Sequence, residues 1–540
     1  MARLDRLGGA KEVAQVGAVI GRGFSYALLH AVSPFPEAEL QAALVRLADA
    51  ELLYPRGLPP EATYVFKHAL VQDTAYASLL KSRRRALHRA IARVLAERFR
   101  DTAETQPELL AVHYTEAGEG EPAVAAWQRA AEHAVARSAF VEAAGYYTKG
   151  LEVLGTLPDT PARAQQELLL QVALGRVLLA TKGYGSPEAA QAFARARALG
   201  EQLGDTAQLL HVLLGLFASS FGRRELQAVQ VLSDEILRLA ESNGGPAALV
   251  WGHLAAGMTR YLRGELVAAR EHLTGAIASY DEEHHPLPGD PGVMALSIAA
   301  CVEWLLGFGD AARQRGRASL ALARRLKKPV DLAYAQLFAG LLHVLLREPD
   351  RAREMAESLV QLSTEQQFPW YLATGAMQRG WALAEQGRLE EGIAQLREGL
   401  IGYTATMPEA DPFYLGLLAE AQAQAGAPAE ALATVEDALA TAPEEVWKPD
   451  LLRVRGDLLA RQGAEASAVE ASYREAMDLA RRHGAKAFEL RAATSFGRWL
   501  QAQGRAVEAR DLLAPIYGWF TEGFDTRDLR EAKALLEELG

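Results

Sequence analysis

The stretch GWALAEQGRLEEGIAQLREGL, residues 380–400, has the pattern of two short helices joined at a glycine. The small residue Gly380 is followed seven positions later by the turn residue Gly387, and five positions further on by a second small residue, Gly392. Helices that cross at small residues can approach closely, and bulkier neighbours then fill the groove between them. Because glycine readily adopts the left-handed conformation that ends a helix, this stretch predicts an antiparallel helix pair that turns at Gly387.

The same pattern recurs along the chain with a spacing of about 40 residues. The leading small residues are Gly215, Gly257, Ala300, Gly340, Gly380, Ala419, Gly456 and Gly497. The turn residues that follow them are Gly222, Gly264, Gly307, Arg347, Gly387, Gly426, Gly463 and Gly504. Two further copies can be recognised upstream, in residues 137–154 and 175–200. Since each pair leaves an apolar face uncovered, the pairs must stack on one another, which predicts an all-α solenoid of helical hairpins.

The order of small and large residues in these copies resembles that of tetratricopeptide repeats, and Pro443 ends the repeat that turns at Gly426 as it would in that family. The spacing exceeds the usual 34 residues, which implies longer helices or loops. We expect the repeat solenoid over residues 161–540, with a helical connector and a first repeat over residues 103–160.

Residues 1–102 do not show the repeat. Three short helices are predicted within residues 9–21, 25–33 and 36–50, followed by two strands around the sequence LPPE. Three helices and a β-hairpin are typical of a winged-helix-like module, and we expect one here.

A run of lysine and arginine follows the predicted hairpin. On a helix over residues 81–100, one face carries Leu87, Ile91, Val94 and Leu95, and the opposite face carries Lys81, Arg85, Arg89, Arg93 and Arg100. A DNA-reading helix would need base-reading side chains in a groove-entering helix, and this helix comes after the wing. A solvated or domain-contacting surface is therefore favoured over a DNA contact.

Composition narrows the function classes. The first hundred residues hold 15 Lys and Arg against 9 Asp and Glu, whereas the whole chain carries a net charge of -11. The negative charge therefore lies in the residues after the first hundred, and an acidic region of that size argues against nucleic acid as a general partner. A single cysteine, Cys301, in the apolar sequence SIAACVEWLL is expected to be a buried core residue, and it fits a cytoplasmic protein. No membrane helix is expected, because the apolar runs stop short of about 20 residues.

Three groups of residues could suggest a chemical site. The insertion YDEEHHPLPGDPGVM places His284 and His285 beside acidic residues, but a Pro- and Gly-rich loop is favoured over a metal site. Glu303 beside Trp304 provides no base–nucleophile constellation. An aromatic group (Trp127, Tyr146, Tyr147) lies next to alanines at helical spacing and is expected in the core. The sequence therefore predicts no enzyme and no metal site.

Three long stretches resemble a known arrangement. The sequences YVFKHALVQDTAYASLL (residues 64–80), TKGYGSPEAAQAFARARALGEQLGD (residues 181–205) and FTEGFDTRDLREAKALLEEL (residues 520–539) are similar to the region that follows the ATPase core in bacterial class III adenylate/guanylate cyclase-type signalling proteins. Those proteins join a cyclase domain to a STAND-class ATPase and then to tetratricopeptide repeats. A looser resemblance exists to maltose-regulon-type transcription activators, so a DNA-contacting regulator that acts through the basic N-terminal module is the alternative.

The resemblance implies a non-catalytic regulatory region, because the sequence contains no G-x-x-x-x-G-K-[ST] loop to hold phosphates. The chain looks like the C-terminal half of such a protein, so ATP or ADP would belong to ATPase and cyclase domains acting in cis or in trans. His68, in VFKHALVQD, would then contact the nucleotide phosphates, which a histidine at a strand-to-helix turn can do. A protein or peptide would bind the concave face of the solenoid.

Overall fold

The structure is a computed structural model that describes residues 7–204, 208–243, 245–282, 289–407, 409–441 and 446–540. Pro443 and the His284–His285 pair lie outside the described residues. The chain divides into two compact units, Met1–Val177 and Leu178–Gly540. The predicted boundaries at residues 102 and 160 stay predictions.

Unit 1 begins with three helices and a small antiparallel sheet. The helices are α2 (Gly9–Ile20), α3 (Tyr26–Val32) and α4 (Glu37–Asp49), and the strands are β1 (Gly23–Ser25), β2 (Leu53–Arg56) and β3 (Thr63–Phe66). The three predicted helices and the predicted hairpin are present. The sheet has a third strand that the sequence analysis missed, because β1 is only three residues long and pairs Phe24 with Tyr64 of the central strand β3.

The remaining helices of unit 1 follow the hairpin. They are α5 (Ala69–Ala77), α6 (Lys81–Arg98), α7 (Arg100–Thr105), α8 (Pro107–Ala117), α9 (Gly120–Ala136) and α10 (Phe140–Leu154), and α11 (Pro161–Lys182) spans the division between the units. The apolar face of α6 is buried as predicted. Its basic residues Arg85 and Arg93 are exposed, and Arg89 pairs with Glu119 at 2.6 Å.

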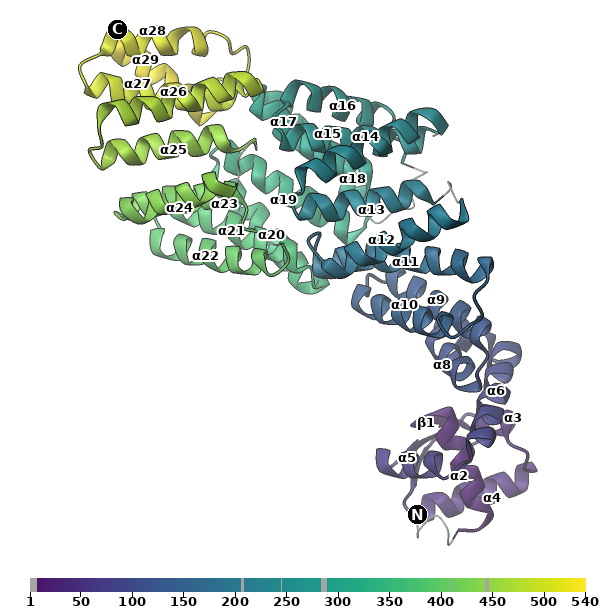
Figure 1. Ribbon diagram of the computed structural model, residues 1–540. Helices are drawn as coiled ribbons and strands as arrows, with labels where there is room; N and C mark the ends of the chain where they lie inside the picture. The colour runs from purple at the N-terminus through teal and green to yellow at the C-terminus, as the bar shows by residue number, and fades with distance from the viewer. Residues whose placement is uncertain (1–6, 205–207, 244, 283–288, 408, 442–445) are drawn as a thin grey trace. The chain divides into compact units, whose positions relative to one another are not determined.

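Unit 2 is the repeat solenoid, and the fold is all-α and tetratricopeptide-like (Figure 1). After α12 (Pro187–Leu203), each predicted copy is a helix pair. The first helices are α13 (Leu209–Gly222), α15 (Pro246–Leu262), α17 (Pro291–Leu305), α19 (Pro329–Leu345), α21 (Pro369–Glu385), α23 (Pro412–Gln424), α25 (Lys448–Arg461) and α27 (Lys486–Ala502). The second helices are α14 (Leu226–Asn243), α16 (Leu266–Ala278), α18 (Gly309–Leu326), α20 (Pro349–Gln366), α22 (Leu389–Thr404), α24 (Pro428–Thr441), α26 (Ala466–His483) and α28 (Ala506–Tyr517), and α29 (Arg527–Leu539) closes the unit.

At Gly257, Gly380 and Gly456 small residues lie where the paired helices cross, as predicted, whereas Gly215 and Gly340 lie closest to Phe193 of α12 and Gln378 of α21, outside their own pairs. A Cβ atom added at Gly380 would lie 2.8 Å from the carbonyl oxygen of Gly392 and 2.8 Å from the backbone nitrogen of Leu396. A Cβ added at Gly257 would meet Leu273 at 2.8 Å, and one at Gly456 would meet Tyr473 at 2.7 Å. At Gly380 the two helices therefore meet backbone against backbone, and the backbone of α22 cannot move aside as a flexible side chain could.

The turn positions confirm the repeat register at seven of the eight copies. Gly387 has a φ of 85°, which belongs to the left-handed region, and Arg347 adopts the same region with a φ of 58°. The prediction at Gly222 is wrong, because Gly222 is the last residue of α13 and the left-handed residue is Arg224, with a φ of 56°. Gly222 is small for another reason: a Cβ there would lie 2.5 Å from the backbone of Tyr184.

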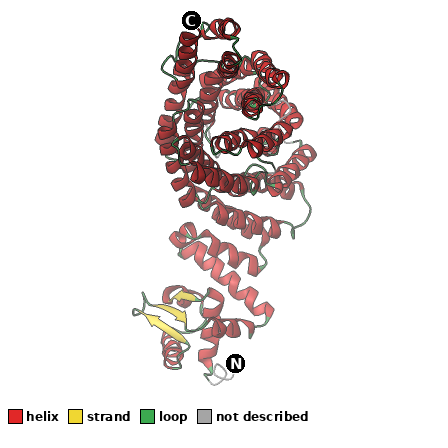
Figure 2. Ribbon diagram, turned by 90° about the vertical axis from the view of Figure 1, so that its left-hand side faces the viewer, coloured by secondary structure: helices red, strands yellow, loops and turns green. Residues whose placement is uncertain are grey.

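The helices of unit 2 wind around a common interior, which brings distant repeats together (Figure 2). The amide of Val446 donates a hydrogen bond of 3.2 Å to the carbonyl of Leu262. The rings of Trp304 and Phe488 contact each other edge to face, with their centres 5.5 Å apart. Residues of the first helices line most of this interior.

Candidate binding sites in the second unit

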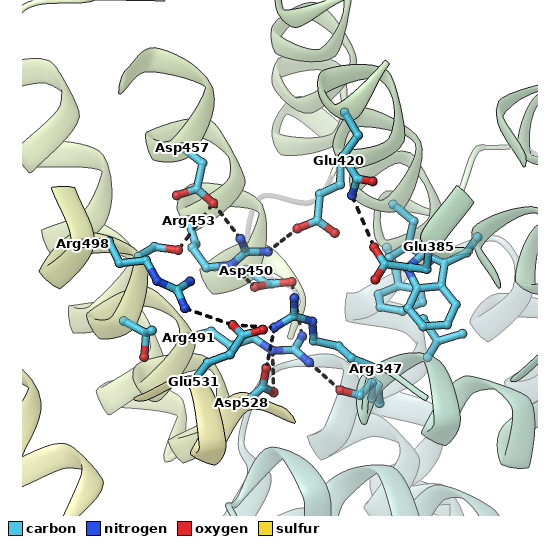
Figure 3. Close-up of a pocket in the computed structure, with 18 of the residues that line it drawn as sticks. Arg347, Glu385, Glu420, Asp450, Arg453, Asp457, Arg491, Arg498, Asp528 and Glu531 are labelled. Carbon is cyan, nitrogen blue, oxygen red and sulfur yellow. Dashed lines mark hydrogen bonds and ion pairs between the residues drawn. The ribbon is translucent and has the colours of Figure 1, made fainter. Parts of the chain in front are cut away.

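A charged cleft of about 230 Å³ lies in the interior of unit 2 (Figure 3). Its walls are the first helices α19, α21, α23, α25 and α27 together with the closing helix α29. The charged residues that line it are Arg347, Glu385, Glu420, Asp450, Arg453, Asp457, Arg461, Arg491, Arg498, Asp528 and Glu531. We name this group of residues the charged cleft.

Arg453 is the best-buried cation of the charged cleft. Its guanidinium donates to Asp450 at 2.6 Å, to Asp457 at 2.8 Å and to Glu420 at 2.7 Å, and Arg453 is 8% exposed. Burial by itself would lower the pKa of the guanidinium, but the three carboxylates raise it well above its ordinary value. Arg453 therefore stays charged and holds α23 against α25.

Arg347 and Arg491 connect repeats that are far apart in sequence. Arg347 pairs with Asp528 at 3.2 Å and with Glu531 at 3.0 Å. Arg491 pairs with Asp528 at 2.8 Å and also donates to the carbonyl of Leu345. These contacts tie the turn after α19 to α27 and α29, and Figure 3 shows the four partners converging.

The edge of the charged cleft differs from its base. The side chain of Arg498 is 51% exposed and pairs with Glu531 at 3.3 Å, and Arg461 and Gln424 are also exposed. A cleft with exposed donors and acceptors of both signs above a fixed base can bind a polar chain through hydrogen bonds and charge pairs.

A second site, the apolar pocket, occupies about 190 Å³ between the first helices α13, α15, α17, α19, α21 and α23. Its lining is dominated by aromatic side chains. They are Tyr184, Phe217, Phe221, Trp251, Tyr261, Tyr334, Phe338, Trp370, Tyr403, Phe413, Tyr414 and Trp447. Burial raises the pKa values of the Tyr261 and Tyr334 hydroxyls well above the ordinary value, so these groups remain neutral.

Two charged residues line the described part of the apolar pocket, Arg224 and Asp411, and they pair with each other at 3.0 Å. Asp411 also caps α23 by accepting a hydrogen bond of 2.9 Å from the amide of Phe413. The lining is therefore electrically neutral, with one ion pair at its side.

His68 is exposed and lies where it was predicted, between β3 and α5. It is the N-cap residue of α5, and its side chain makes no capping hydrogen bond. Its backbone carbonyl accepts a hydrogen bond of 3.0 Å from the amide of Val71. The role of His68 toward a nucleotide stays a prediction.

The other residues considered from sequence are packed. Cys301 is fully buried, which raises the pKa of its thiol to about 12. Glu303 is buried and accepts a hydrogen bond of 3.1 Å from Arg270. Trp127 and Tyr147 are buried in unit 1, and Tyr146 is partly buried and stacks on Trp127 with ring centres 5.6 Å apart.

The residues of the two sites were not predicted from the sequence. Two signals could have pointed to them: the arginine at position 347, where the other copies have glycine, and the concentration of tryptophan and tyrosine in the first helices. Among the described residues no cluster of three or more His, Cys, Asp or Glu could hold a metal ion. In the same part of the chain no helix is long and apolar enough to cross a membrane.

Comparison with known proteins gives a relative but no family assignment. No family model matches the sequence. An uncharacterized protein of Rhizobium meliloti (strain 1021), R02095, is 26% identical over 514 residues, a match that covers 91% of this chain and 49% of that protein. The chain thus spans about half the length of the curated relative it matches.

The solved structures with some likeness to this chain have low sequence identity to it. A Rap protein complexed with competence and sporulation factor has a TM-score of 0.48 at 13% identity, covering 69% of this chain and 100% of that chain. NprR in complex with its cognate peptide NprX has a TM-score of 0.42 at 12% identity, covering 70% of this chain and 98% of that chain. Yeast Tom70 has a TM-score of 0.33 at 12% identity, covering 85% of this chain and 96% of that chain. The fold assignment rests on the helix pairs themselves.

Proposed function

We propose that this chain is the non-catalytic regulatory and interaction region of a STAND-type signalling ATPase or nucleotide cyclase, and that unit 2 binds a peptide or protein segment in its interior. The observation that carries the proposal is the charged cleft, where six helices from distant parts of unit 2 present polar side chains to one space.

The charged cleft suits an extended polypeptide. Such a ligand carries amide donors and acceptors along its whole length, and the exposed edge offers Arg461, Arg498 and Gln424 while the base is held by buried ion pairs. Because the base is already paired, little side-chain ordering is needed on binding, which favours affinity.

The N-terminal module would relay the bound state to an ATPase core. The order of α2, β1, α3, α4, β2 and β3 is typical of a winged-helix-like module, and it leaves His68 exposed at the first turn of α5. A ligand of unit 2 would act by shifting a population between two forms of the full protein, for which it must bind one form more tightly.

Peptide binding is tested by panning a random dodecapeptide phage library on the full chain and measuring the affinity of the enriched peptides by calorimetry. We expect Arg498→Glu to weaken binding about tenfold, since it reverses a charge at the edge of the charged cleft. Arg388→Glu is the matched control, because Arg388 is also 51% exposed, pairs with Glu391, and lies outside both sites. Failure to enrich any peptide, or equal losses in both variants, would contradict the proposed function.

The ATPase connection has its own test. An antibody against α27–α29 applied to a lysate of the source cells should detect a protein well above 58.4 kDa if the ATPase is part of the same chain. A band at 58.4 kDa would instead require a separately encoded partner, whose absence from a pull-down would count against the relay.

A further inference from the structure

The apolar pocket differs from an ordinary packed core in that it retains about 190 Å³ of open volume. An engineered apolar cavity of roughly 150 Å³ stays dry and binds benzene, so a space of this size accommodates a molecule of one or two rings. Protein interiors seldom keep such volumes without a ligand, because unfilled space forfeits dispersion contacts.

The lining selects for aromatic character and against charge. Trp370, Trp447 and Tyr403 offer ring faces and edges, which favour stacked or edge-to-face contact with another ring. Arg224 and Asp411 neutralise each other at 3.0 Å, so a charged ligand would enter without a counter-ion.

One polar group in the wall has only a weak partner. The Trp370 indole nitrogen is buried, and within the described residues its N–H meets the Tyr403 hydroxyl in a contact that falls short of full hydrogen-bond geometry. A buried donor with a poor acceptor is costly, and a ligand that carries a hydrogen-bond acceptor would relieve that cost.

We propose that the apolar pocket is a binding site for a small, neutral, one- or two-ring aromatic molecule whose hydrogen-bond acceptor receives the N–H of Trp370. The site goes beyond the proposed function and does not depend on it, because the ligand is not a peptide and the charged cleft takes no part.

The pocket also joins two parts of the coil. Tyr184 contacts Trp370 edge to face at 5.4 Å, and Arg224 reaches Asp411, so residues before α15 meet residues after α20 across the pocket. A ligand that fills this space adds contacts to both sides, and it therefore stabilises the closed coil in proportion to its occupancy.

The test uses the full chain and three probes of matched shape: quinoline, naphthalene and 1-naphthoate, with affinities measured by ligand-observed NMR at neutral pH. Quinoline and naphthalene differ in one acceptor nitrogen, and 1-naphthoate adds a charge. We expect quinoline to bind more tightly than naphthalene, 1-naphthoate to bind at least about tenfold more weakly than either, and quinoline to raise the melting temperature.

Two variants locate the site. Trp370→Phe keeps a ring and removes the N–H, so it should abolish the preference of quinoline over naphthalene, whereas Trp499→Phe, outside the pocket, should preserve that preference. Ala255→Trp fills the volume and should abolish binding of both neutral probes. If Ala255→Trp fails to fold, the Trp370→Phe comparison still decides the matter.

Three outcomes with these probes and variants would overturn this proposal. They are the absence of any binding by the neutral probes, equal affinity for the charged probe, and an unchanged quinoline preference in Trp370→Phe. Tighter binding of N-acetyl-tryptophanamide than of quinoline would also overturn it, since the occupant would then be a peptide side chain. Arg498→Glu should leave quinoline affinity unchanged, which separates this site from the peptide site.

Discussion

The charged cleft and the apolar pocket are built from the same kind of element, the first helices of consecutive repeats, and they even share Phe413. In the charged cleft most charged side chains pair with one another, and Arg453 alone pairs with three carboxylates. The pocket confines charge to one ion pair and surrounds open volume with rings. Ion pairs hold the repeats together at the charged cleft, whereas at the apolar pocket the repeats meet through apolar packing that leaves open volume.

Two turns illustrate the same contrast. In most copies the left-handed turn residue is glycine, but arginine occupies it at positions 224 and 347. A residue with a Cβ costs about 1–2 kcal/mol in this conformation. In return Arg224 pairs with Asp411 beside the apolar pocket, and Arg347 pairs with Asp528 in the charged cleft. A left-handed residue with a Cβ thus lies beside each candidate site, as one also does at the helix ends Lys327 and Gln367.

The largest expected effect is on the charged cleft. Arg453→Met leaves three carboxylates without their cation, and we expect the free energy of unfolding of unit 2 to fall by about 3–5 kcal/mol. Urea unfolding followed by tryptophan fluorescence measures this, because tryptophans 251, 304, 370, 381, 447, 499 and 519 all lie in unit 2.

The neighbouring Arg455 provides the control for that prediction. It pairs with Glu436 at 2.8 Å, and its side chain is 34% exposed, so Arg455→Met should cost at most about 1 kcal/mol. Equal losses for both variants would mean that the buried network does not hold the repeats together.

The next effect concerns a carboxyl group close to the apolar pocket. Asp331 is buried, one of its oxygens accepts from the amide of Asp290 at 2.7 Å, and the other has no partner in the described residues. Burial raises the pKa of Asp331 to about 6. Between about pH 4 and pH 6 the folded state holds a proton that the unfolded state has released, so stability falls as the pH rises through this window.

Asp331→Asn removes this titration. The stability of the variant relative to the natural chain should increase by about 2–3 kcal/mol from pH 4 to pH 7. Urea unfolding at both pH values measures the difference. A difference that does not change with pH would show that Asp331 titrates normally in the folded state.

A smaller effect is expected at α21, which lines both sites. Gly380→Leu forces a side chain against the backbone of α22 and should cost roughly 1–3 kcal/mol. Hydrogen exchange should show faster exchange in α21 and α22 than elsewhere. Gly145→Leu is the control, since a Cβ at Gly145 meets nothing within 4 Å, and unchanged exchange in Gly380→Leu would contradict the repeat register.

The smallest effect is expected at the edge of the charged cleft. Arg498 pairs with Glu531 at 3.3 Å, and its side chain is half-exposed. Arg498→Ala should therefore change the free energy of unfolding by about 0–1 kcal/mol. The change should shrink further at high salt. A loss as large as that of Arg453→Met would erase the distinction between the edge and the base.

The repeat architecture could be predicted from the residue pattern alone. Small residues at fixed spacing indicate helix crossings, since a Cβ at Gly380 or Gly456 would overlap the partner helix. Glycine at the turns indicates a left-handed backbone conformation. These are local requirements within one pair of helices. The strand β1 was not predicted because three residues are too few to show an alternating pattern. Gly222 was wrongly predicted as a turn residue, because a small residue is needed there for the close contact with Tyr184.

The positions of the two candidate sites follow from contacts between distant repeats. Arg347 and Asp528 are 181 residues apart, and Arg224 and Asp411 meet across several repeats, so no local pattern relates them. Their meeting depends on the small rotation between successive helix pairs, which accumulates into a closed coil. That rotation is set by the packing of many side chains at once, and it turns a regular one-dimensional repeat into one interior with a charged cleft and an apolar pocket.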